Sequence, residues 1–255
     1  MYEMKLLDHG FGGLLFLAAL SLLLSASAVV AAETYEKDRL TGPSGEVEIT
    51  FLGHASLILS AGGKVVQIDP FSKVADYATL PKADLVLITH EHPDHLDQAA
   101  LKAIRKESTR VFASAAVAEQ VAGATAMANG DRLTVDGIGA EAVPAYNIKH
   151  ERSPGAPYHP KGRGNGYVVT IAGLKIYVAG DTENVPEMKN LGKIDVAFLP
   201  MNLPYTMTPE MVADAARMIG PKILYPYHFG ETDTSRLAVL LKDRPDIEIR
   251  IRRMP

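Results

Sequence analysis

The feature that most constrains this chain is a dense run of metal-binding side-chain types directly after an apolar stretch. Residues 85–89 have the length and composition of a buried strand. Residues 90–97, which follow at once, hold three histidines and three carboxylates. Pro93 restricts His92 to extended backbone and prevents a helix from starting before Asp94. The fold must therefore present a loop of clustered imidazole and carboxylate groups at the end of a strand, which is typical of a metal site.

Composition limits what else the chain can use. It has 255 residues and no cysteine, which excludes disulfides, thiolate nucleophiles and cysteine-ligated zinc. The formal net charge of −4 gives no basic footprint for nucleic acid. After removal of an N-terminal segment, the length suits one large α/β domain.

The N-terminus has the pattern of an export signal. Residues 11–32 carry no charge and end in small residues, with Ala26-Ser27-Ala28 and Val30-Ala31-Ala32 as candidate cleavage sites. We therefore expect residues 1–32 to be a signal peptide, residues 33–255 to be the mature domain, and the protein to be periplasmic or secreted. The alternative is an uncleaved membrane anchor, because 22 uncharged residues are long enough to span a bilayer. Without that anchor we expect no stable membrane association.

Beyond the leader, strand and helix patterns alternate. β-branched and apolar runs bounded by turn residues predict strands at 47–52, 56–59, 64–68, 85–89, 110–113, 133–135, 140–144, 167–171, 174–179, 196–199, 223–225 and 247–251. Helical spacing predicts helices at 96–105, 115–122, 209–219 and 235–241. The segment 146–166, rich in Gly, Pro and charge, is predicted to be a long functional loop. The order favours two mixed sheets packed together and covered by helices.

The run after the strand resembles the signature of the metallo-β-lactamase fold hydrolases. His-x-His-x-Asp-His is matched here by His90, His92, Asp94 and His95. The turn Gly53-His54-Ala55-Ser56 is similar to one found in the branch that includes ascorbate-6-phosphate lactonase. The resemblance runs from about Val47 to the C-terminus. It implies an α/β (α+β) fold, a four-layer αββα sandwich, with metals at one edge where loops from the two sheets meet.

The same resemblance implies a ligand set for two ions. His90 and His92 would bind the first metal, while Asp94 and His95 would bind the second. Asp181, in Gly180-Asp181-Thr182, matches the aspartate that bridges both metals. His228, in Tyr225-Pro226-Tyr227-His228, matches the last ligand of the second metal.

One ligand of the first metal departs from the simplest pattern. Many relatives have histidine where this chain has Asn147, so His150 and His159 are the candidates to replace it. We favour His159, which abuts the Gly-rich turn into the next strand, because His150 lies among charged neighbours in what resembles a solvated stretch. Asp69 resembles a family aspartate that supports the histidine cluster. His54 would hydrogen-bond near the metals, contact substrate, or serve only as a turn residue.

These expectations add up to a metal-dependent hydrolase. Two divalent ions, zinc as first choice and manganese or iron as second, would generate a bridging hydroxide near neutral pH. Asp94 and Asp181 would be the catalytic carboxylates that fix this hydroxide for attack on an ester, lactone, amide or phosphodiester bond. The substrate is expected to be a small molecule, with Lys161 and Arg163 as candidate partners for an anionic group. The sequence sets no oligomeric state.

Two other functions compete with this hypothesis. A non-catalytic exported metal-binding protein would keep the site without turnover, although a long loop over the ligands favours catalysis. A di-iron oxidoreductase of the same fold is disfavoured, because those relatives replace the second histidine of the motif by a carboxylate and this chain has His92.

Overall fold

The computed structural model describes residue 1 and residues 35–254, so the predicted leader 1–32 lies outside the described residues. Residues 35–254 contain two seven-stranded sheets, a two-stranded hairpin and short helices. Within that range no helix is long and apolar enough to cross a membrane.

The first sheet follows the chain, with strand order β1 to β7. Its strands are β1 (Glu36–Gly42), β2 (Gly45–Gly53), β3 (Ser56–Ala61), β4 (Lys64–Ile68), β5 (Leu85–Ile88), β6 (Arg110–Ala113) and β7 (Ala124–Ala126). Strands β1 to β4 are antiparallel and joined by tight turns, whereas β4 to β7 are parallel. Parallel pairs need longer crossovers. Helices α1 (Gln98–Ile104) and α2 (Ala115–Ala118) lie in the last two of them.

The second sheet has the order β16-β15-β14-β13-β12-β9-β8. Its strands are β8 (Arg132–Val135), β9 (Ile138–Ala145), β12 (Gly164–Ile171), β13 (Leu174–Val178), β14 (Val196–Pro200), β15 (Ile223–Tyr227) and β16 (Glu248–Ile249). The 3-10 helix η1 (Pro186–Asn190), α3 (Pro209–Ile219) and α4 (Arg236–Leu240) belong to this half. Helix α3 has the predicted limits, because Thr208 caps its start and Gly220, at φ 61°, ends it.

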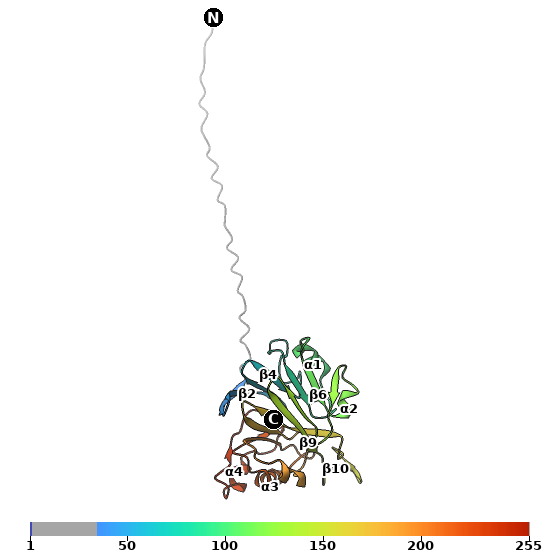
Figure 1. Ribbon diagram of the computed structural model, residues 1–255, viewed down its shortest axis with the longest axis vertical. Coiled ribbons are helices and arrows are strands. Elements are labelled where there is room, and N and C mark those ends of the chain that lie inside the picture. Colours follow the sequence, from blue (N-terminus) through green and yellow to red (C-terminus); the bar gives the residue numbers. More distant parts are fainter. Residues whose placement is uncertain (2–34, 255) are drawn as a thin grey trace. The chain divides into compact units, whose positions relative to one another are not determined.

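The two sheets pack face to face around one apolar core. Ile49 and Leu87 of the first sheet share a buried cluster with Val169 and Phe198 of the second. Separate clusters bury α1 and α2 on the outer face of the first sheet, and η1, α3 and α4 on the outer face of the second. Figure 1 shows α1 and α2 at one side of the domain and α3 and α4 at the other. The predicted four-layer αββα sandwich is confirmed.

Several elements are shorter in the structure than the sequence pattern predicts. The helix expected at 115–122 ends at Ala118, and the last strand shrinks to β16. The structure also adds β1, β7 and η1, and it places the hairpin β10 (Glu151–Ser153) and β11 (Ala156–Pro157) inside the segment expected to be a loop. Strand β1 is an edge strand with half-exposed and exposed residues in alternation, so it carries no apolar pattern for sequence reasoning to find.

Candidate metal centre

The loop after β5 is fixed by hydrogen bonds that begin at Asp69. The fully buried carboxylate of Asp69 accepts hydrogen bonds from Thr89 N at 2.8 Å and Thr89 Oγ1 at 2.7 Å. It also lies 2.8 Å from Nδ1 of His95, whose ring is fully buried. This contact is what the expected supporting role of Asp69 requires, since an imidazole held at Nδ1 presents Nε2 in a fixed direction.

Asp181 follows a strand of the second sheet and lies beside two histidines that follow a strand of the first. It follows β13 and Gly180, which has φ 66°. A Cβ atom at Gly180 would lie 2.8 Å from the carbonyl oxygen of Asn165 and 3.1 Å from Cβ of Thr89. Only glycine permits this approach, which brings Asp181 to the histidines of the other sheet.

The structure gathers the predicted residues into two groups. The first group comprises His90, His92, His159 and Asp181, and the second comprises His54, Asp94, His95 and His228. Within each group, one potential ligand atom per residue lies within 4.8 Å of the others. Both groups combine histidine with a carboxylate, the donor set that suits zinc, manganese or iron. The members expected from sequence thus come together, and His54 joins them.

Asp181 faces both groups at once. Its Oδ1 lies 3.4 Å from Nε2 of His95 and 3.4 Å from Nε2 of His228. Its Oδ2 lies 3.2 Å from Nε2 of His159 and 3.9 Å from Nε2 of His90. The two oxygens of one carboxylate therefore point to different sets of imidazoles.

Buried polar atoms without hydrogen-bond partners collect at this point. Among the described residues they include Nε2 of His90, His95, His159 and His228, and Oδ1 of Asp181. An orphaned buried polar atom is costly, and several that converge on one place need an explanation. Divalent metal ions fit, because each would accept the lone pairs of these imidazoles.

The electrostatics of the cluster suit cation binding. Burial, together with His95, holds the pKa of His90 well below its usual range, and burial also lowers the pKa of His92 and His228. These rings are therefore neutral at pH 7, the form that binds metal. Burial alone would raise the pKa of Asp181, but His228 and His95 lower it strongly, so the carboxylate is ionised. Burial would lower the pKa of His95, but Asp181 and Asp69 outweigh it and raise the pKa to about 9, so a metal ion competes with a proton there.

Backbone strain is concentrated at the same place. His54, Asp69 and His228 have φ values of 52°, 46° and 46°, in the left-handed region that non-glycine residues rarely adopt. Such conformations persist where the surrounding structure holds them and are often found at functional sites.

The structure distinguishes between His150 and His159, the two candidates for the remaining ligand of the first metal. His159 is buried in the group, whereas His150 lies against Glu183, with Nδ1 2.7 Å from Oε1. Asn147 holds His159, because its Oδ1 accepts a hydrogen bond from His159 N at 2.8 Å and lies 2.7 Å from His159 Nδ1. The asparagine that replaces a histidine of many relatives thus orients the histidine used instead.

Glu183 is a further functional residue that sequence reasoning missed. Its side chain is fully buried, and Oε1 accepts hydrogen bonds from Asn147 Nδ2 and His150 N. Its Oε2 accepts from the backbone N–H groups of Ile148 and Lys149. Although burial would raise the pKa of Glu183, these bonds lower it. The carboxylate therefore folds the start of the loop into the shape that places Asn147.

Replacing Asn147 by alanine is expected to weaken metal binding at the first group by about 10–100-fold, the typical effect of losing an outer partner of a ligating histidine. Titration with a chromogenic zinc chelator measures this affinity. Asn129→Ala is the matched control, since Asn129 donates hydrogen bonds to Asn165 Oδ1 and to the carbonyl oxygens of Val143 and Gly164, and none of these acceptors belongs to either group. An unchanged affinity in Asn147→Ala would contradict the positioning role.

His54 turns out to be a neighbour of the second group. Its Nε2 lies 2.9 Å from Oδ2 of Asp94, and its ring centroid lies 3.8 Å from that of His228. Of the roles left open for His54, hydrogen bonding near the metals is the one that the structure supports. Asp94 Oδ2 also lies 3.8 Å from Nε2 of His95, consistent with its predicted place in the second group.

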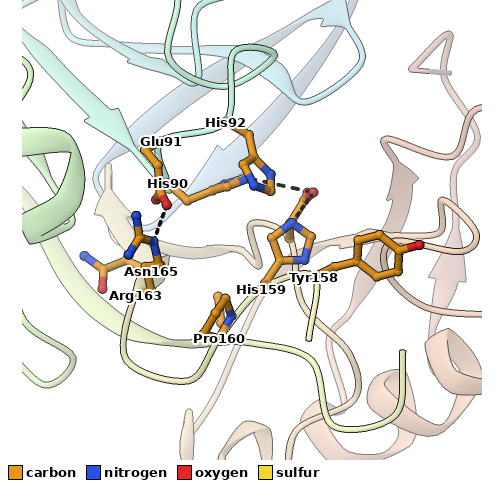
Figure 2. A pocket seen from close by; sticks show the side chains of 11 residues that line it. His90, Glu91, His92, Tyr158, His159, Pro160, Arg163 and Asn165 are labelled. Carbon is orange, nitrogen blue, oxygen red and sulfur yellow. Dashed lines mark hydrogen bonds and ion pairs between the residues drawn. The ribbon is translucent and has the colours of Figure 1, made fainter. Parts of the chain in front are cut away.

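The two cations expected to meet an anionic substrate are already paired. Arg163 forms an ion pair with Glu91, and Lys161 pairs with Glu187 at 2.7 Å. Figure 2 shows His90, His92 and His159 converging on one side of a pocket, with the pair of Glu91 and Arg163 on another side and Tyr158 beyond His159. The pocket therefore opens directly onto the first group.

Comparison with known proteins agrees with this geometry. Residues 48–228 match the β-lactamase superfamily domain. The chain is 34% identical over 196 residues to a UPF0173 metal-dependent hydrolase of Thermococcus kodakarensis, covering 72% of this chain and 84% of that protein.

Solved structures give the same result. A protein of Parabacteroides distasonis described as a metal-dependent hydrolase superposes with a TM-score of 0.83 at 47% identity, covering 87% of this chain and all of that one. A metallo hydrolase from Ignicoccus hospitalis, Igni18, gives a TM-score of 0.66 at 25% identity, covering 80% of this chain and 94% of that one. The predicted family and the predicted metal dependence are confirmed. This chain belongs to the β-lactamase superfamily and, within it, to the UPF0173 metal-dependent hydrolases.

Proposed function

We propose that this hydrolase uses two divalent ions, one at each group, and that zinc is the preferred metal. The observation that carries the proposal is the placement of Asp181, whose oxygens face His95 and His228 on one side and His159 on the other. A carboxylate so placed offsets the repulsion between two dications. When bound, such ions polarise the bond to be cleaved and lower the pKa of water to near neutrality.

The residues of the chain hold this chemistry in place. His90, His92 and His159 would hold one ion, and Asp94, His95 and His228 the other, with Asp181 between them. The side chains of Asp69 and Asn147 contact the Nδ1 atoms of His95 and His159, respectively, and so fix the orientation of these rings. Two of the proposed ligands are therefore oriented before substrate arrives, which favours efficient positioning.

The purified protein is expected to hold close to two zinc ions per chain, and dialysis against a chelator is expected to abolish its activity. Mass spectrometry of the metal content, before and after reconstitution, measures the first. One ion per chain at saturation would contradict the dinuclear proposal while leaving metal dependence intact. Parallel reconstitution with manganese and iron tests the choice of metal.

The bond that is cleaved is proposed to be an ester, lactone, amide or phosphodiester, in a small molecule. A panel of p-nitrophenyl esters, bis-p-nitrophenyl phosphate, lactones and a chromogenic cephalosporin, assayed with the zinc-loaded protein, separates these classes. No turnover on any member, with both ions bound, would contradict the proposed reaction.

A further inference from the structure

Arg152 brings a guanidinium to the edge of the first group. It lies on β10 of the hairpin β10–β11, in the same loop as His159. Its Nη2 lies 3.2 Å from Nε2 of His92, and its guanidinium carbon lies 5.6 Å from the ring centroid of Tyr158. The side chain is thus held over an aromatic face beside a residue of the metal centre.

Arg152 differs from the other cations near the site in its charge balance. Lys161 and Arg163 are paired with Glu187 and Glu91. Among residues 35–254, Arg152 has no carboxylate within ion-pair distance, and its polar contact is with His92. Its donors therefore face a neutral ring rather than an anion.

That contact with His92 is incompatible with metal ligation. A neutral imidazole that binds a metal carries the metal on one nitrogen and a proton on the other. Nε2 of His92 is then taken by the metal or by the proton, so it cannot accept a hydrogen bond from Arg152. In the working enzyme the guanidinium needs another acceptor, and carboxylate or phosphate oxygens match its planar set of donors.

A partly exposed pair of aromatic rings adjoins this cation. We call it the aromatic wall: Tyr158 and Tyr205. The rings of Tyr158 and Tyr205 meet edge to face, with centroids 5.1 Å apart. Tyr205 is 45% exposed, and Asn147 Nδ2 donates a hydrogen bond to its carbonyl oxygen at 2.9 Å, which ties the two loops together. Exposed aromatic side chains beside a polar site are typical of a ligand-binding surface.

We propose that Arg152 binds an anionic group of the substrate and that the aromatic wall binds an apolar group next to it. The substrate class is a small molecule in which a carboxylate or phosphate adjoins an aromatic or aliphatic portion. This inference rests on the proposed hydrolytic function and gives it a specificity.

Calorimetric titration of the zinc-loaded full chain tests this proposal without turnover. The probes are 4-phenylbutyrate, 4-phenylbutylphosphonate and neutral 4-phenylbutanol. Arg152→Gln is expected to weaken the binding of at least one anionic probe by about tenfold, or about 1.4 kcal/mol, and to leave the alcohol unchanged. Arg152→Lys should restore part of the loss. Tyr205→Ala should weaken all three probes alike.

The control is Arg110→Gln, which makes the same change of charge on an exposed residue at the start of β6, away from the loops that carry the site. The affinities of this variant for the three probes should stay within about twofold of those of the wild type. That change is well below the tenfold effect of losing a charged hydrogen bond. Anion binding that survives in Arg152→Gln, equal losses in Arg110→Gln, or no binding of any probe to the wild type would overturn the proposal. Hydrolysis of the substrate panel is measured in a separate assay. If no substrate of that panel is hydrolysed, the proposed function is contradicted, whereas the role of Arg152 is still decided by the binding of the three probes. The anion that responds to Arg152 distinguishes a carboxylate substrate from a phosphate one.

Discussion

Replacement of Asp181 by asparagine is expected to abolish hydrolysis of every accepted substrate while the chain stays folded. The amide has nearly the same volume, so packing is preserved in this buried position. It is neutral, however, and it cannot offset two dications or bridge them with two equivalent oxygens. One ion should be lost or displaced, and with it the geometry on which the reaction depends.

The measurement combines turnover number, metal content and melting temperature. Asp136→Asn is the control, because Asp136 is an exposed turn residue that pairs with Lys64 on the surface. It should leave turnover unchanged. If folded Asp181→Asn kept more than about a tenth of wild-type turnover, a loss of under about 1.4 kcal/mol in barrier terms, Asp181 would not be the bridge.

His159→Ala is expected to lower metal content and activity far more than His150→Ala. The first change removes an imidazole from the buried group that contains Asp181, so its effect on affinity should exceed the roughly 10–100-fold caused by losing an outer partner. The second removes a ring that contacts Glu183 at the loop base, and the hydrogen bonds from the loop backbone to Glu183 remain.

Elemental analysis of both variants, with circular dichroism to verify folding, shows which of the two histidines is needed for metal binding. Equal metal content in the two proteins, or a greater loss in His150→Ala, would show that His159 is not a metal ligand.

The proximity of the central site residues could be predicted from the sequence because the signal is local. His90, His92, Asp94 and His95 lie within six residues, on the one loop that follows β5. Asp181 and His228 could be predicted as site residues only through the family resemblance. A single aspartate or histidine after a strand often has only a structural role, in a turn or in packing.

What the sequence did not predict depends on contacts between distant segments. In the sequence Asn147 stands out only as a position where many relatives have histidine, because its bond to His159 requires the loop to return on itself. Glu183 carries no sequence signal, since its partners are backbone N–H groups, which every residue other than proline has. The sequence does not distinguish Arg152 from Lys161 and Arg163, because only the fold decides which cations are paired with Glu187 and Glu91.

The order of the site residues along the chain also bears on how the enzyme is made. The first group is supplied by residues up to Asp181, whereas the second also needs His228, which follows β15. Small zinc domains fold around their metal because they have little else to hold them. Here the apolar core between two seven-stranded sheets supplies the driving force instead, and residues from both halves meet only once those sheets have docked. We therefore expect metal to bind after the two sheets have docked, because only then do the ligands from both halves face one another.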